Sequence, residues 1–272
     1  MSYFVIDLQV KRAGMIQHHK LVAPAPVFAA VMFVHALDKK TELGGINGVG
    51  LIHRTYRPYI EHIEHKPDKV DHLLVDECLI SQRGACGFSI DNNSPKEMSI
   101  QPAVHADLIW TLIVSCNNAF DRDSESHVRD TIKGMRFAGG CIERAIVRNF
   151  DNYDDAFRPR GGMWIDDATT GPITSAEELL EPLARQGGGK KERLWLAPAN
   201  LGYATIETPR PRKGSRSECQ HAYAEHLLGL VSYTPIHRKP AEEKHLWKHG
   251  WVGSQFVVTN RDQPLSATPT FI

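Results

Sequence analysis

Apolar and polar positions alternate at the start of the chain. Between residues 3 and 10 every second position is apolar, and the positions between are of mixed character, with Phe4, Ile6, Leu8 and Val10 on one side and Val5, Asp7 and Gln9 on the other. A period of two is typical of a strand with one buried face. Pro24 and Pro26 then precede an almost wholly apolar stretch over residues 27–37, which predicts a buried helix with proline near its first turn.

The middle of the chain repeats this pattern. Residues 104–115 alternate strongly and are apolar on both sides, which predicts a central strand. Residues 121–133 are polar except at Val128 and Ile132, four apart, which predicts an amphipathic helix, and residues 141–150 predict another strand. The order strand, helix, strand, strand, helix, strand favours an α+β, ferredoxin-like fold of the kind shared by RNA-recognition motifs.

The second half of the chain has a different character. The pattern predicts a short helix over 175–185, a strand over 195–208, a helix over 218–230 and a last strand over 251–259. A flexible basic linker with three consecutive glycines stands at 187–191. We therefore divide the chain into a core at 1–150, a reduced insertion or linker at 151–194, and a C-terminal part at 195–272 that packs on the core.

Composition narrows the class of protein. The 272 residues are 42% hydrophobic, enough for a sizeable core, but contain no apolar run of about 18 residues, so no membrane span is expected. The first residues lack the basic and apolar regions of a secretory signal. The five cysteines are odd in number and show no Cys-x-x-Cys spacing, so we expect reduced thiols in a cytoplasmic protein, without a disulfide framework or a structural zinc site. No metal and no cofactor are predicted.

The charges are balanced overall but unevenly distributed. There are 32 basic and 32 acidic residues. Residues 185–216 hold eight Lys or Arg and two Glu, whereas residues 151–182 hold eight Asp or Glu and two Arg. One surface can therefore bind an anion while another stays acidic.

A glycine-containing motif lies between the predicted helix at 121–133 and the strand at 141–150. Here Arg136 and Phe137 stand just before Gly139 and Gly140. Glycines allow close approach of another backbone, a guanidinium pairs with phosphate, and an aromatic ring stacks on a base. The alternative is a plain turn into a strand, with Phe137 in the core and Arg136 in solvent.

Four ordered blocks make the chain resemble a known family. Its members are the subunits that hold the 5′ handle of the guide RNA in type I-F (Csy-type) CRISPR surveillance complexes, the fifth Cas family of the RAMP superfamily. The blocks are Phe-Val-His-Ala-Leu at 33–37, Gly-Val-Gly at 48–50, Met-Arg-Phe-Ala-Gly-Gly at 135–140, and Leu-Leu-Gly-Leu at 227–230 with Pro-Ile-His-Arg at 235–238. A weaker match is Trp-Leu-Ala-Pro at 195–198 followed by Gly202 and Tyr203. The long helical insertion usual in the family is replaced by the short segment 151–194.

The resemblance implies a binding role in antiviral defence. Such a subunit caps the backbone filament of Cascade, the ribonucleoprotein complex, and binds the 5′ handle of the crRNA without cutting it. Its partners would be the crRNA, the large subunit and the backbone subunit, with target DNA met only through the complex. The implied fold is a ferredoxin-like RAMP core.

Basic, aromatic and glycine residues that suit an RNA contact stand in and around these blocks. The candidates for RNA binding are His19, Lys20, Arg136, Phe137, Gly139, Gly140, Arg144, Arg148, Arg158, Arg160, Arg212, Lys213 and Arg238. Arg144 and Arg148 are four apart, so they share one face of the predicted strand. No catalytic residue is predicted.

The runner-up is a metal-independent endoribonuclease that processes guide RNA. Fourteen histidines are present, and His18, His19 and His35 are its acid–base candidates. A metallohydrolase has candidate ligands at 61–65 and at His245 and His249, but their spacing matches no known zinc motif.

Overall fold

The computed structural model describes residues 2–18, 21–41, 45–59, 61–62, 79–80, 82–85, 100–117, 122–158, 161–171, 173, 176–185, 195–213, 219–239 and 242–261. The helices are α1 (Val27–Thr41), α2 (Arg122–Lys133), α3 (Tyr153–Phe157) and α4 (Ala176–Arg185), with 3-10 turns η1 (Ile236–Arg238) and η2 (Glu243–His245). The longer strands are β1 (Ser2–Gly14), β4 (Ile46–Pro58), β9 (His105–Cys116), β11 (Gly140–Phe150), β12 (Met163–Asp167), β13 (Trp195–Thr205), β14 (Ala224–Pro235), β15 (Lys248–Val252) and β16 (Gln255–Thr259). The short strands are β2 (Ile16–His18), β3 (Leu21–Val22), β5 (Glu61–His62), β6 (Leu79–Ile80), β7 (Gln82–Ala85), β8 (Ile100–Ala103) and β10 (Arg136–Phe137).

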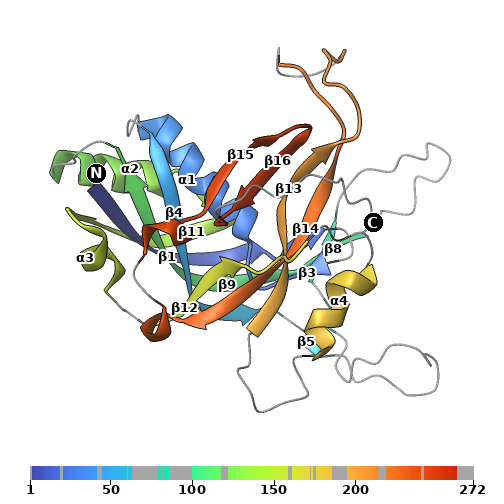
Figure 1. Cartoon of the computed structure of the whole chain (residues 1–272), viewed down its shortest axis with the longest axis horizontal. Coiled ribbons are helices and arrows are strands. Elements are labelled where there is room, and N and C mark those ends of the chain that lie inside the picture. The colour runs from blue at the N-terminus through green and yellow to red at the C-terminus, as the bar shows by residue number, and fades with distance from the viewer. Residues whose placement is uncertain are drawn as a thin grey trace.

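The predicted α+β, ferredoxin-like fold class is wrong. Within the described ranges, ten strands form a single antiparallel sheet in the order β10-β11-β1-β9-β4-β12-β14-β13-β16-β15, with few helices beside it (Figure 1). The sheet does not end at β4, because Met163 and Trp164 of β12 pair with His53 and Ile52 at its edge. The C-terminal half then continues the same sheet, which local patterns along the chain do not reveal.

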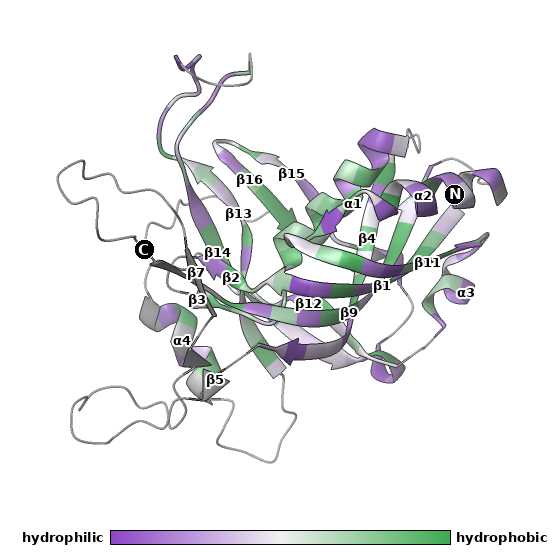
Figure 2. Cartoon of the chain, turned by 180° about the vertical axis from the view of Figure 1, so that it is seen from behind, coloured by the Kyte–Doolittle hydropathy of each residue, from purple (hydrophilic) through white to green (hydrophobic). Residues whose placement is uncertain are grey.

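Helices α1 and α2 cover one face of the strands β11, β1, β9 and β4. Phe4, Ile6 and Leu8 of β1 are at most 1% exposed and belong to the same core cluster as Val128 and Ile132 of α2. In Figure 2, apolar and polar residues alternate along these strands, which is the pattern of a sheet with one covered face. The predicted central strand at 104–115 is confirmed as β9, between β1 and β4.

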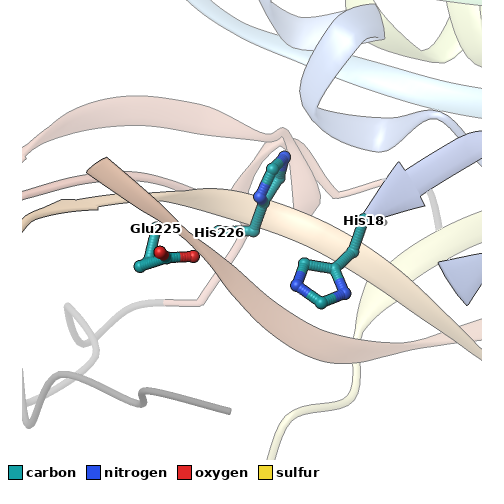
Figure 3. A group of neighbouring side chains, drawn as sticks. All are labelled: His18, Glu225 and His226. Carbon is teal, nitrogen blue, oxygen red and sulfur yellow. The ribbon is translucent and has the colours of Figure 1, made fainter. Parts of the chain in front are cut away.

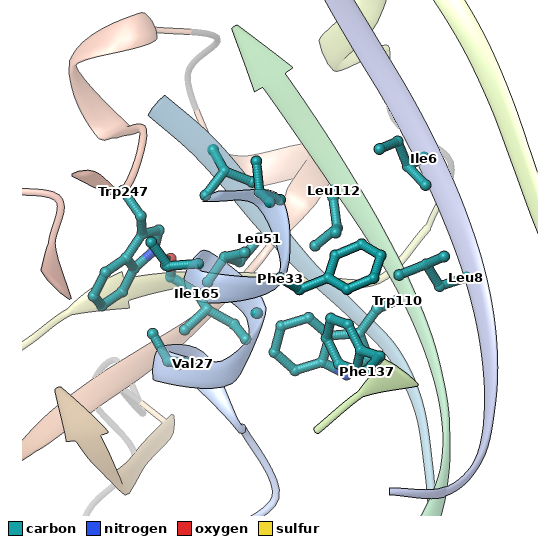
Figure 4. Close-up of a cluster of buried hydrophobic side chains, with 14 of the residues drawn as sticks. Ile6, Leu8, Val27, Phe33, Leu51, Trp110, Leu112, Phe137, Ile165 and Trp247 are labelled. Carbon is teal, nitrogen blue, oxygen red and sulfur yellow. Dashed lines mark hydrogen bonds between the residues drawn. The ribbon is translucent and has the colours of Figure 1, made fainter. Parts of the chain in front are cut away.

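The sheet curves around α1, so that its C-terminal strands reach the same helix. The Phe28 ring of α1 lies 5.0 Å from the Tyr203 ring of β13 and 6.2 Å from the Phe256 ring of β16, between centroids. Trp247, which precedes β15, donates a hydrogen bond from Nε1 to the carbonyl of Ile165 in β12 at 2.9 Å. Both residues lie in the core cluster of Figure 4. The core thus joins both halves of the chain.

The opposite face is covered only in part. Tyr153 and Phe157 of α3 pack with Tyr3, Val5 and Trp164 in a second apolar cluster. Val5 is therefore fully buried, although its position on the strand suggested the solvent side. Beyond this cluster most side chains of the face are polar, with Ile109 and Ile146 among them.

One secondary-structure prediction fails outright. Residues 218–230 were expected to form a helix, but residues 224–235 are strand β14, hydrogen-bonded to β13 on one side and β12 on the other. Leu227, Leu230 and Val231 are buried there. An apolar run of this length fits a helix or a strand, and here the pairing with β12 and β13 favours the strand. The last predicted strand is a hairpin of β15 and β16. Among the described residues, no helix is long and apolar enough to cross a membrane.

Candidate nucleic-acid interface

The uncovered part of the second sheet face is the candidate site, and we call it the open face. Residues directly opposite each other in an antiparallel ladder point to the same side. Arg148 lies opposite Val5, and Arg144 opposite Gln9, so both arginines face away from α1 and α2. The prediction that they share one face of a strand is confirmed. The open face consists of Asp7, Gln9, Lys11, Arg54, Arg57, Asp107, Ile109, Thr111, Arg136, Glu143, Arg144, Ile146 and Arg148.

Asp7 organises the middle of the open face. Its carboxylate forms an ion pair with Arg148, accepts a hydrogen bond from the Thr111 hydroxyl at 2.5 Å, and lies 3.7 Å from the Arg54 guanidinium. The Arg148 side chain is still 40% exposed. Asp7 therefore holds two guanidinium groups in place while leaving part of each facing solvent.

A second carboxylate neutralises one end of the face. Lys11 contacts Asp107 at 2.6 Å, and the Tyr59 hydroxyl donates to Asp107 at 2.9 Å. Partial burial on its own raises the pKa of Asp107, but these hydrogen bonds outweigh it and hold the pKa below its usual value. Lys11 is thus committed to an internal pair and is a weaker candidate for an anion contact.

Arg57 and Arg144 are the most available cations. Both residues are exposed, and neither has an ion pair within the part of the chain that the structure describes. Arg57 lies opposite Asp107 and Arg144 opposite Gln9, so they stand on strands β4 and β11 at the two sides of the open face. Arg54 and Arg57 were not among the predicted residues. Their spacing of three along one strand carries no signal by itself, because only the register and the bulge in β4 turn both toward the open face.

The glycine-containing motif is a hairpin of β10 and β11. Phe137 is fully buried, and its ring lies 5.5 Å from Phe33 and 5.6 Å from Trp110 between centroids (Figure 4). It therefore does not stack on a base, and the core alternative considered for this ring is the one observed. Arg136 is exposed at a corner of the open face, and its Nη1 donates to the Gly139 carbonyl at 3.3 Å.

The two glycines of this motif serve the protein's own chain. A Cβ on Gly140 would lie 2.6 Å from the Lys11 carbonyl oxygen, so Gly140 permits close approach of β11 to β1. Gly139 has φ +76°, and a Cβ there would meet nothing within 4 Å. The turn needs Gly139 for its backbone conformation, and Gly140 provides internal packing, not an approach for RNA.

The remaining predicted RNA-binding residues are scattered. Arg212 pairs with Glu207, and its guanidinium lies 4.2 Å from the centre of the Tyr223 ring, at the distal end of β13 and β14. Lys213 is exposed beside it. Arg158 is paired with Asp155 after α3, and Arg238 is exposed on η1. His19, Lys20 and Arg160 lie outside the described residues.

An aromatic pocket opens at the edge of β4, on the side of the sheet that faces α1, because His53 lies opposite Trp110 and Tyr56 opposite Leu108 of the core. It has a volume of about 640 Å³ and is lined by Pro24, His53, Tyr56, Met163, Trp195 and Tyr233. β12 pairs with β4 only through Met163 and Trp164, opposite His53 and Ile52. The pocket forms beside residues 54–58 of β4, which have no pairing with β12. Arg54 also lines this pocket, while its guanidinium lies beside Asp7 on the open face.

His53 is a neutral wall of this pocket. Its ring lies 5.2 Å from Trp110 and 5.8 Å from Tyr233 between centroids, and its Nε2 donates to the Thr55 carbonyl at 3.2 Å. Burial lowers the pKa of His53 to about 4. Near neutral pH the ring is therefore uncharged, with Nδ1 left as an acceptor.

The depressed pKa of His53 predicts an acid-sensitive fold. Below about pH 6.5 the unfolded chain protonates this histidine first, so stability falls from pH 6.5 to about pH 4 and then levels off for this group. We expect this to contribute a loss of about 2–3 kcal/mol in the free energy of unfolding. Urea titrations at pH 7, 5.5 and 4.5 would show a shallower decline in a His53→Gln variant. The exposed His127→Gln variant is the control, and a decline in His53→Gln as steep as in the parent would contradict the assignment.

Two pairs of histidines bear on the nuclease alternative. The His18 ring meets the His226 ring edge-on with centroids 5.3 Å apart, and ligand atoms of His18, Glu225 and His226 lie within 4.8 Å of one another (Figure 3). Glu225 and His226 are consecutive residues of a regular strand, which directs their side chains to opposite faces. The three groups are nevertheless close enough to be candidate ligands of one metal ion.

The other pair is His35 and His249, with centroids 4.6 Å apart beside a second pocket of about 590 Å³. His18 and His35, the described nuclease candidates, are therefore in different places, and His19 lies outside the described residues. The predicted ligands at 61–65 lie outside the residues whose side chains are described.

The chain was also compared with known proteins. No model of a known protein family matches it, and no curated protein matches it.

Proposed function

We propose that the protein is a non-catalytic RNA-binding subunit that holds the 5′ handle of the guide RNA in a type I-F CRISPR surveillance complex. The observation that carries the RNA-binding role is the open face, where Arg54, Arg57, Arg136, Arg144 and Arg148 share one uncovered side of the sheet. Guanidinium groups pair with phosphates, and the exposed strands between them leave room for an extended single strand. The assignment to a surveillance complex comes from the ordered sequence blocks described above, and the proposed cytoplasmic location comes from the cysteine pattern.

The geometry of the open face also fits a role in binding without catalysis. The cations of the open face are five arginines and the paired Lys11, and arginines remain protonated and do not act as general acids or bases near neutral pH. Asp7 and Asp107 are committed to ion pairs and hydrogen bonds. This face thus has the residues to hold a phosphate backbone and lacks an evident proton-transfer pair.

The alternative function, a metal-independent endoribonuclease, rests on the His35–His249 pair. Two imidazoles at one pocket are the minimum for acid–base cleavage of RNA. Burial lowers the pKa of His249, and the nearby His35 lowers it further. The lowered pKa favours the neutral imidazole, which is the form that can act as a base. Incubation of precursor guide RNA with the protein in chelator tests it: we expect intact RNA, whereas a defined cut that is lost in His35→Ala would favour the nuclease.

Assembly tests the main proposal. Coexpression with the large subunit, the backbone subunit and a crRNA is expected to give a stoichiometric complex that contains this chain. The handle oligonucleotide, taken from the repeat of the accompanying array, is expected to bind more tightly than a uridine dodecamer. A folded chain that never joins the complex and shows no handle preference would contradict the proposal.

A further inference from the structure

We propose that the aromatic pocket at the edge of β4 receives one unstacked nucleobase of the bound RNA strand. This inference rests on the proposed RNA-binding function and assigns a specific subsite to it. The pocket lies between the edge of β4 and the strands β13 and β14.

The position of the pocket connects it to the phosphate-binding surface. Arg54 contributes to the pocket wall, and its guanidinium is 3.7 Å from Asp7 in the middle of the open face. The pocket rings lie on the other side of β4 from Arg57, but β12 pairs only with Ile52 and His53, so among the described residues the edge of β4 beyond them is open. A strand whose phosphates contact Arg54 and Arg57 can therefore follow this edge and reach the pocket around it. A base rotated out of this strand enters the pocket while its phosphate stays on the arginines.

The walls have the chemistry that a base requires. Trp195, His53, Tyr56 and Tyr233 offer flat rings, and Pro24 and Met163 complete an apolar lining. The volume of about 640 Å³ lies within the range of about 300–1,000 Å³ usual for small-ligand sites. Trp195 is 59% exposed, so its indole is accessible as a stacking platform.

The pocket also contains an unsatisfied polar group. The Tyr233 hydroxyl is buried and has no hydrogen-bond partner among the described residues. Such a group is costly unless a ligand pairs with it. The edge of a nucleobase supplies both donors and acceptors, and His53, whose Nδ1 is an acceptor, lines the same pocket. An apolar side chain or a lipid would leave both groups unpaired.

Abasic scanning is the direct test. The handle oligonucleotide and the uridine dodecamer are each made as a series with one abasic position, and their affinities for the full-length protein are measured by fluorescence anisotropy. We expect one position in the handle to cause a loss of about 5- to 100-fold, since stacking of one base contributes that much. A scan with no sensitive position overturns the inference.

Three variants identify the pocket as the origin of that effect. Trp195→Ala is expected to bind the intact handle about as weakly as the parent binds the sensitive abasic strand, and to be indifferent to that abasic position. Trp251→Ala is the matched control, because Trp251 is similarly exposed but lies on β15 outside the pocket. Tyr233→Phe is expected to fold as stably as the parent, since no hydrogen bond is lost, yet to bind the handle about 3- to 10-fold more weakly. Unchanged affinity in both Trp195→Ala and Tyr233→Phe overturns the inference.

Failure of the pocket and failure of the proposed function give different results. If the parent binds the handle and the dodecamer equally, the handle assignment fails, and the scan on either strand still decides the role of the pocket. If the handle is preferred but no position is sensitive, only the pocket inference fails. If the parent binds neither strand, both are overturned.

Discussion

Replacing Arg57 and Arg144 together by glutamate is expected to weaken handle binding by about 100-fold or more near 0.1 M salt. Both side chains are exposed and have no ion pair among the described residues, so the fold does not depend on them. Each is expected to pair with a phosphate, and charge reversal replaces that attraction with repulsion. The logarithmic salt dependence of binding should fall by about 1.4, since each lost phosphate contact to a single strand contributes about 0.7.

Affinities measured between 50 and 300 mM salt provide this test. The matched control is Lys39→Glu with Lys40→Glu, because these lysines are exposed on α1, which covers the other face of the sheet. The control has the same change in net charge, so it measures how much binding weakens through the overall charge of the protein alone. Equal losses in the two double variants would mean that the open face is not the interface.

The second large effect is expected at Gly140. A valine there would place its Cβ 2.6 Å from the Lys11 carbonyl oxygen and 2.7 Å from the Ala13 nitrogen, both of them backbone atoms that do not easily move. Gly140→Val should therefore cost on the order of 3–5 kcal/mol of stability, and β11 would separate from β1. Any loss of RNA binding would follow from this damage to the fold.

Thermal melting and circular dichroism distinguish this effect from a direct RNA contact. Gly139→Asn is the control in the same turn, because its position is open and asparagine tolerates a positive φ. It should cost at most about 1 kcal/mol and leave binding intact. If Gly140→Val melted like the parent while binding the handle poorly, the glycine would contact RNA after all.

Much of the local structure was predictable from the pattern of apolar residues. Alternation at 3–10 and 104–115 identifies β1 and β9, and the spacing of Val128 and Ile132 identifies the buried side of α2. The shared face of Arg144 and Arg148 also follows, because side chains alternate along any strand. These features depend on neighbours a few residues apart, which the sequence displays directly.

The candidate site was predictable only in part. Arg136, Arg144 and Arg148 were identified in advance and lie on the open face, whereas Phe137 is in the core and Arg212 lies at the distal end of β13. Arg54 and Arg57 were missed, since their orientation depends on a bulge in β4 and on its register with β9. The aromatic pocket joins residues more than 170 positions apart, so no local motif announces it.

The sequence by itself determined which segments alternate, where α1 and α2 form, and which residues of each strand lie on the same side. Only the tertiary structure decided that β12 pairs with the edge of β4, that residues 224–235 form a strand, and that ten strands make one sheet. The physical reason is the range of the interactions. Helix formation and side-chain alternation are set within a few residues, whereas strand pairing requires backbone partners from distant segments, whose choice depends on the burial of the whole core.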